Sequence, residues 1–417
     1  ADTPRPGHRQ HNRAQYRHHP TGPSYQLDVY NSKNATISTQ NNLYKHFIIT
    51  SKKMKVDIIG SFLPPTELAE AKRLYAAGAM DAATYRKIED RAVDDLVANE
   101  LKAGLTEVPS GEFRRQYWDK DFYFGLNGLT KERLDSGRVY AEDNVLTDLL
   151  RVKGRIAANP EHPFYEDFKY LQKIVNGRAT CRQTLPSPGE LYVRILSMSQ
   201  GKPDSLYPDT EQLLADITDT YRDTIRHFYD LGCRSLQLDD TIFGRISTDA
   251  YTKHLLMGGI DVMTLQEVLI ALTNACINGV PADMHISIFI SGGDTIVPSW
   301  QNVDYADDVI PKALSRLKVA QFYLPFDGKH AKSLDALRFV PADKQVALGL
   351  IDAHTPWAYY SDRILGCIDA AQRYIAPQLL SITPKTGFKL SKYSEKGLDY
   401  SDQWRKLQDL HTLVDNI

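Results

Sequence analysis

The sequence carries almost no charge imbalance and has no long apolar run. Its 417 residues include 50 Lys and Arg against 52 Asp and Glu, for a formal net charge of -2. Such a balance provides no overall basic field to attract nucleic acid or an anionic membrane surface. No run approaches the roughly 18 apolar residues that a membrane-spanning helix needs. We therefore expect neither nucleic acid nor a membrane as a partner.

Cysteine is also scarce, with four residues that form no Cys-x-x-Cys pair: Cys181, Cys233, Cys276 and Cys367. Wide spacing argues against a disulfide framework and against a cysteine-rich zinc module. We expect reduced thiols in a cytoplasmic protein.

Residues 1–53 lack both apolar periodicity and the apolar core of a secretory signal. They are polar, basic and rich in histidine, whereas Met54 stands directly before a strong strand pattern. We expect 1–53 to be an N-terminal extension, added to a native chain that starts at Met54, and 54–417 to be the folded domain. A basic arm for nucleic acid is the less favoured alternative, because few aromatic residues are interleaved with the charges.

Eight short apolar runs alternate with amphipathic helical patterns from residue 54 onward. Most are continuous rather than alternating, which is typical of strands buried on both faces of a parallel sheet. The predicted strands are 55–62, 106–113, 179–188, 233–240, 284–291, 319–326, 345–353 and 379–388. This repetition predicts an α/β protein with a (β/α)8 TIM barrel, with an insertion at 125–178 between strands 2 and 3. A doubly wound sheet is the main rival, but no GxGxxG turn follows the first strand.

Polar residues gather where the predicted strands end, which is where barrel enzymes place their active sites. Buried carboxylates cost free energy unless a ligand, a cation or hydrogen bonds compensate them, so the pattern favours a functional site. The residues concerned are Gly60, Ser61, Glu112, Gln237, Asp239, Asp240, His285, Ser287, Asp352 and His354.

Several of these residues also have a purely structural interpretation. Arg114 and Arg115 could pair with nearby acids or could meet an acidic ligand. Asp239 could cap the following helix. His285 could be a metal ligand, an acid/base or a core histidine with satisfied nitrogens.

Five segments occur in a fixed order along the chain: DIIGSF, SGEFRRQYW, CRSLQLDDT, GLIDAHTP and TPKTGFK. Together they resemble the catalytic barrel of cobalamin-independent methionine synthase, and in particular its short single-barrel bacterial homologues, over residues 54–417. The resemblance implies methyl transfer from 5-methyltetrahydrofolate to the thiol of homocysteine. In that family a zinc ion holds the thiol as the nucleophilic thiolate.

The resemblance also implies roles for individual residues. Ile59, Gly60 and Ser61 would hold the substrate carboxylate, while Glu112 and Asp239 would hold its ammonium group. Gln237, two residues before Asp239, is grouped with these substrate-binding residues. His354 would protonate the folate leaving nitrogen, with Asp352 beside it, and we add Asp240 as a further acid/base candidate.

The zinc ligands of the family are largely missing from this sequence. The family pattern has His-x-Cys at the fifth strand, Glu at the sixth and Cys at the eighth, where this chain has His285 and Ser287, Pro325, and Thr386. Catalytic zinc needs about three protein ligands. We therefore expect no zinc, with His285 the remnant of a metal site and the base that remains for catalysis.

Three functions stay open at this point. The first is a methyltransferase acting on a thiol amino acid, with methyltetrahydrofolate as co-substrate. The second is a metal-free enzyme on another small amino acid or a pterin-like ligand. The third is a non-catalytic binding protein. The oligomeric state also stays open, with a homodimer among the options.

Overall fold

The computed structural model describes residues 54–133, 148–198, 206–247, 251–253, 255, 259–291, 309–326, 331–353, 361–389 and 398–417. All described elements belong to one compact unit, Lys53–Ile417. The predicted extension 1–53 lies outside the described residues. Among the helices of the described part, none is long and apolar enough to cross a membrane.

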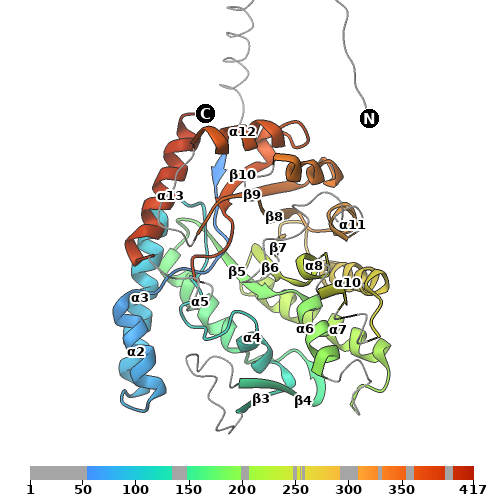
Figure 1. Ribbon diagram of the computed structural model, residues 1–417. Coiled ribbons are helices and arrows are strands. Elements are labelled where there is room, and N and C mark those ends of the chain that lie inside the picture. The colour runs from blue at the N-terminus through green and yellow to red at the C-terminus, as the bar shows by residue number, and fades with distance from the viewer. Residues whose placement is uncertain are drawn as a thin grey trace, which may run out of the picture. The chain divides into compact units, whose positions relative to one another are not determined.

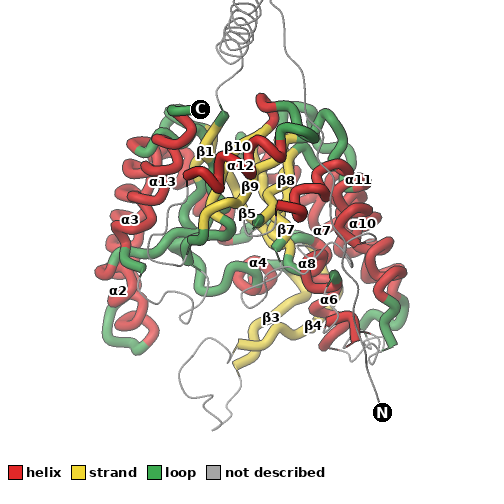
Figure 2. The backbone as a smooth tube through the Cα atoms, turned by 45° about the horizontal axis from the view of Figure 1, so that its top comes forward, coloured by secondary structure: helices red, strands yellow, loops and turns green. Residues whose placement is uncertain are grey.

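The centre of the domain is a curled parallel sheet surrounded by helices (Figures 1 and 2). Its strands follow the order β1-β10-β9-β8-β7-β6-β5-β2, as expected for a (β/α)8 barrel. Beyond the two terminal strands of this order, the Phe62 N–H donates to the Gly111 carbonyl at 3.1 Å. The strands are β1 (Lys55–Val56), β2 (Glu107–Val108), β5 (Thr180–Pro186), β6 (Ser235–Asp240), β7 (His285–Ile290), β8 (Gln321–Pro325), β9 (Gln345–Ile351) and β10 (Leu380–Pro384). Each lies within one of the eight predicted runs, so the predicted fold is confirmed.

The helices pack on the outside of this sheet because each has one apolar face. In α7 the buried residues Leu213, Ile217, Tyr221, Ile225 and Phe228 recur every three to four positions. The helices are α2 (Thr66–Ala76), α3 (Ala82–Lys102), α4 (Lys120–Phe124), α5 (Pro163–Val175), α6 (Pro188–Met198), α7 (Thr210–Asp230), α8 (Ile242–Ile246), α10 (Val262–Ile277), α11 (Val309–Arg316), α12 (Ser361–Ala371) and α13 (Tyr400–Asp415). Two 3-10 segments are η3 (Ala331–Phe339) and η4 (Pro377–Leu379).

The expected insertion between the second and third barrel strands is present. It contains an antiparallel ribbon of β3 (Asn127–Arg133) and β4 (Asp148–Ala157), followed by α5. Figure 2 shows the ribbon extending away from the barrel strands. Helix α7 packs against β4, and a bidentate pair between Arg155 and Asp216 joins the two elements. The insertion is therefore anchored to the outer helical layer.

The inside of the barrel has its own small apolar cluster, separate from the main core between sheet and helices. Ile59, Phe289, Tyr323 and Ala347 form it, and all four are buried. Strand residues two apart point to the same face, so polar residues at the same alternate positions of the strands also face the barrel interior, next to this cluster. These inward-facing positions carry the candidate site.

Candidate functional site

Two interacting carboxylates, Glu112 after β2 and Asp239 on β6, lie at the carboxyl end of the barrel. Glu112 follows β2 with a left-handed backbone φ of 60°, and its Oε1 accepts hydrogen bonds from Thr184 Oγ1 at 2.9 Å and from Arg115 at 3.0 Å. Asp239 lies near the end of β6 and is 9% exposed. Burial, and then the negative charge of Glu112, raise the pKa of Asp239 well above its ordinary value. A cationic ligand group would therefore be stabilised here.

The Ile59–Gly60–Ser61 turn lies beside this pair, as predicted. Gly60 has a φ of 152°, and a Cβ atom there would come within 3.0 Å of Thr184 Cγ2 and 3.9 Å of Glu112 Oε1. On its other side, Ser61 Oγ donates to the Lys389 carbonyl at 2.9 Å. The turn thus joins the Glu112 loop to the segment after β10.

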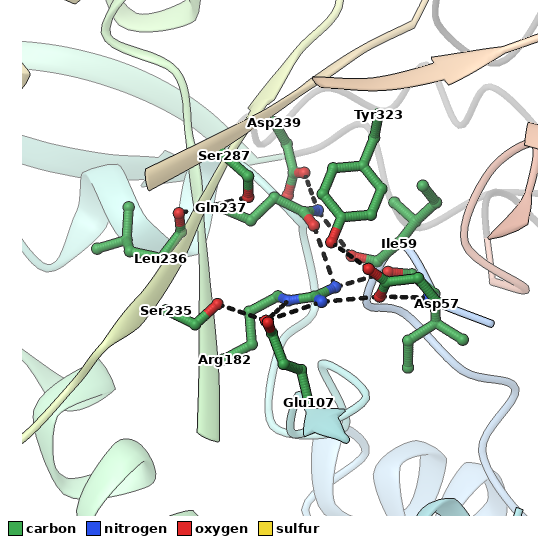
Figure 3. Close-up of polar contacts among 11 residues, drawn as sticks. Asp57, Ile59, Glu107, Arg182, Ser235, Leu236, Gln237, Asp239, Ser287 and Tyr323 are labelled. Carbon is green, nitrogen blue, oxygen red and sulfur yellow. Dashed lines mark hydrogen bonds and ion pairs between the residues drawn. The ribbon is translucent and has the colours of Figure 1, made fainter. Parts of the chain in front are cut away.

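Gln237 is buried beneath these groups and its amide group connects them (Figure 3). Its Nε2 donates to the Ile59 carbonyl at 2.6 Å and to Asp239 Oδ1 at 2.7 Å. Both N–H donors are therefore used within the protein. The structure brings Gln237 to the predicted site, but as a connection between two of its walls.

A deeper layer of charged residues was not predicted from the sequence. Arg182 crosses the barrel interior to reach Asp57 at 2.7 Å and Glu107 at 3.0 Å (Figure 3). Glu107 also accepts from Ser235, and Tyr323 donates to Asp57 at 2.7 Å. Burial disfavours the charge on Glu107, but Arg182, the Ser235 hydroxyl and His285 together lower the pKa of Glu107 to about 2. The alternating direction of side chains along a strand could have identified this layer. Arg182 and Thr184 share one face of β5, as Gln237 and Asp239 share one face of β6.

Asp240 lies on the opposite face of β6 from Asp239 and is not part of this group. It accepts from Ser187 Oγ at 2.5 Å and from the Phe243 N–H at 2.9 Å, so it caps the first turn of α8. The capping role considered for Asp239 therefore belongs to its neighbour. The structure does not bring Asp240 to the site in which we expected it to act.

The expectation that His285 lies at the carboxyl end of the barrel is wrong. His285 is the first residue of β7 and pairs in register with Ser235, whereas Asp239 pairs with Phe289. Four strand residues span about 13 Å, so His285 lies at the amino end, near Glu107 and Lys55. Burial lowers the pKa of its imidazole. Ser287 lies midway between the levels of His285 and Phe289, since it pairs with Gln237, and it is buried.

The His-x-Ser pattern lies at the start of the apolar run, which is the amino end of β7. In a parallel sheet the carboxyl ends of neighbouring strands meet at one edge, and on β7 that edge is formed by Ile290 and the following Ser291. Ser291 donates its N–H to the Asp240 carbonyl at 2.8 Å. The register of the strands, rather than the motif, decides which residues of β7 face the site.

The predicted pair at the end of β9 is described only in part. Asp352 follows the last residue of β9, its side chain is exposed, and its carbonyl accepts from Lys406 Nζ at 2.7 Å. His354 lies outside the described residues. Their joint role as proton donor therefore stays a prediction.

The two arginines after β2 both have structural partners. Arg114 contacts Glu89 at 2.8 Å and Asp90 at 2.6 Å, and its side chain is 5% exposed. Arg115 binds Glu112 and donates to the Thr184 carbonyl at 2.7 Å. Both guanidinium groups are therefore used in contacts within the protein.

The residues present do not fit the zinc ion of the family. The carboxyl end of β8 has Pro325, which has no ligating side chain, and Thr386 after β10 donates its hydroxyl to the Gly387 carbonyl at 3.0 Å. Among the residues that the structure describes, no cluster of three His, Cys, Asp or Glu side chains could hold a metal ion. The cysteines lie elsewhere as well: Cys181 is near the amino end of β5, Cys233 precedes β6, and Cys276 and Cys367 lie in α10 and α12, so none of the four stands at the carboxyl end of a barrel strand.

Comparisons with known proteins agree with this architecture. The profile of the family described as "Cobalamin-independent synthase, Catalytic domain" matches residues 54–398. The uncharacterized protein YxjH of Bacillus subtilis is 29% identical over 364 residues, which cover 87% of this chain and 94% of that protein. A methionine synthase of Saccharolobus solfataricus is 20% identical, over 80% of this chain and 87% of its own.

Solved structures show the same fold. The putative vitamin-B12 independent methionine synthase from Listeria monocytogenes has 27% identity and a TM-score of 0.67, covering 88% of this chain and 98% of its own. A B12-independent methionine synthase from Shewanella sp. W3-18-1, in complex with selenomethionine, has 18% identity and a TM-score of 0.61, with the same coverages. Because the profile spans most of the chain, the protein belongs to the cobalamin-independent synthase family, a family of methyltransferases.

Proposed function

We propose that the carboxyl end of the barrel binds a small amino acid, with its ammonium group between Glu112 and Asp239. The single observation that carries this proposal is the pair of carboxylates Glu112 and Asp239, of which Glu112 contacts Arg115. Arg115 neutralises Glu112, whereas burial and the charge of Glu112 raise the pKa of Asp239, so a cationic ligand group is what would stabilise Asp239 in its charged form. Burying an uncompensated carboxylate is costly, so a site that keeps one is suited to a cation.

The neighbouring turn supports an amino acid over a simple amine. Gly60 is adjacent to Glu112, and the backbone after it runs past Ser61 toward the β10 segment. A ligand whose ammonium lies between the carboxylates would therefore have the backbone of this turn beside its own carboxylate. An α-amino acid carries both charges at this spacing.

The proposed reaction is methyl transfer to such an amino acid, with a methyltetrahydrofolate as methyl donor and His354 and Asp352 as acid/base candidates. Thiol activation would have to proceed without the family's zinc, since the described strand ends provide no adequate ligand set. His285 is not available as the thiol base, because it lies at the other end of β7. The second candidate, a metal-free reaction on another small amino acid or a pterin-like ligand, is favoured by the same mismatch.

Calorimetric titration of the full chain with methionine, homocysteine and 4-(methylthio)butyrate tests the proposal. The last compound is methionine without its ammonium group. We expect the amino acids to bind and the deaminated analogue to bind at least about tenfold more weakly, because it leaves the carboxylate pair unpaired. Equal binding of methionine and its analogue, or no binding of either amino acid, would contradict the proposal.

Two variants on neighbouring residues provide a matched comparison. Asp239→Asn should lose methionine binding by tenfold or more, because the ammonium loses a charged partner. Asp240→Asn changes the same residue type on the opposite face of the strand. It should leave the affinity of the folded protein unchanged.

A further inference from the structure

The side-chain amide of Gln237 has only one orientation that its surroundings accept. Its two N–H donors face the Ile59 carbonyl and Asp239 Oδ1, and its Oε1 faces Arg182 at 3.5 Å. Were the amide turned over, its oxygen would face two acceptors and its NH2 group would face a cation. The network around Gln237 therefore determines which way the amide points.

Arg182 is itself held in one position. Each of its five N–H donors has an acceptor: Glu107 twice, Asp57, the Ile58 carbonyl and Gln237. The side chain is fully buried, and the ring of Tyr323 lies 5.2 Å from its guanidinium carbon. An arginine in this setting keeps its charge and cannot easily change rotamer.

The two residues together connect opposite walls of the candidate site. Arg182 holds the Ile58 carbonyl at 2.7 Å, and Gln237 holds the next carbonyl, that of Ile59, at 2.6 Å. These are the two residues directly before Gly60. Through its second N–H, Gln237 holds Asp239 on β6, on the other side of the interior (Figure 3).

We infer that Gln237, oriented by Arg182, is a positioning residue that sets the place of the Asp239 carboxylate relative to the Ile59–Gly60–Ser61 turn. It acts through these groups and does not itself contact a ligand, since its side chain is fully buried. The inference rests on the proposed function only where methionine binding is used to test it. It replaces the role in substrate binding that the sequence suggested for Gln237.

Gln237→Glu is the sharpest variant because it keeps the size of the side chain. Its carboxylate can still accept from Arg182, but both donors become acceptors that face the Ile59 carbonyl and Asp239. We expect methionine affinity to fall about tenfold or more. Binding should be lost as pH falls and Asp239 takes up a proton. In the variant Asp239 gains a negative neighbour and loses a hydrogen-bond donor, so its pKa should rise, and with it the pH at which half of the binding is lost.

Glu107→Gln is the matched control. Glu107 lies on the far side of Arg182, and its hydrogen bonds are with Arg182 and Ser235 rather than with Gln237 or Asp239. It should lower the melting temperature while the pH profile of methionine binding stays where it is in the wild type. A merely structural role for Gln237 predicts the same behaviour for Gln237→Glu and Glu107→Gln, and that result would overturn the inference.

A readout without ligand separates this inference from the proposed function. Crystal structures of the wild type and of Gln237→Met, which removes both donors without adding charge, compare the positions of Asp239 and of the Ile59 carbonyl. We expect both to move. If they stay in place, the positioning role is wrong even where methionine binds, and if they move while the wild type binds no amino acid, only the proposed function fails.

Discussion

Asp239 and Asp240 are adjacent in the sequence and serve opposite faces of β6. Asp239 points into the barrel and accepts from Gln237, whereas Asp240 points toward the helices and accepts from Ser187 and the Phe243 N–H. Successive side chains of a strand alternate in direction, so one step along the chain separates a candidate binding group from a helix cap.

Asp239→Asn should make the ligand-free protein more stable near neutral pH. The pKa of Asp239 is raised by burial and by Glu112, so the folded state binds its proton more tightly than the unfolded state does. Stability therefore falls as pH rises from the ordinary Asp value through this raised pKa. The asparagine removes that loss while its carbonyl can still accept from Gln237. Thermal unfolding between pH 5 and 8 measures the effect, and a lower melting temperature at pH 8 would contradict it.

Glu190→Gln should remove a second pH dependence. Burial, and then the charge of Asp240, raise the pKa of Glu190 to about 7, and its Oε1 accepts from the Thr241 N–H. As for Asp239, the folded state binds this proton more tightly than the unfolded state does. The stability that this contributes is fully present below pH 4.5 and is lost as pH rises through about 7. The loss has a ceiling on the order of 3 kcal/mol. Denaturant unfolding at pH 5 and pH 8 should show a smaller difference for the variant than for the wild type.

Gly60→Ala should weaken both folding and ligand binding. A Cβ atom at this φ of 152° is strained and would lie 3.0 Å from Thr184 Cγ2. Strained backbone of this kind costs on the order of 1–3 kcal/mol.

The double variant Gly60→Ala with Thr184→Ser tests this cause. Serine removes the methyl group in question and keeps the hydroxyl that donates to Glu112. It should recover part of the stability in a double-mutant cycle. Strict additivity of the two changes would show that the contact is not responsible.

Zinc should not be required for methionine binding. Elemental mass spectrometry of the full chain, dialysed without chelator, should find no stoichiometric zinc at the barrel, and chelator should leave the affinity unchanged. Because the histidines of 1–53 can bind metal adventitiously, His18→Ala with His19→Ala serves as the control. One equivalent of zinc that survives in that variant would return zinc-dependent thiol chemistry as the leading hypothesis.

The sequence by itself determined the fold class and much of the site. Eight continuous apolar runs separated by amphipathic helices indicate a parallel barrel, since both faces of each strand must be buried. Once strands are placed, Glu112, Asp239 and the Ile59–Gly60–Ser61 turn follow as residues at their carboxyl ends. These features are local, or depend only on the rule that parallel strands end at one edge.

The tertiary structure decided what depends on register and on long-range pairing. Parallel pairing of Ser235 with His285 places that histidine at the amino end of β7, although the sequence motif suggested that it lies in the site at the carboxyl end. Ion pairs between β5 and the first two strands make Arg182 a buried connection, and no local pattern identifies partners 75 and 125 residues away. Hydrogen bonds likewise make Gln237 a positioning residue and Asp240 a helix cap. Which partners a strand side chain meets is decided only when the strands have assembled in register.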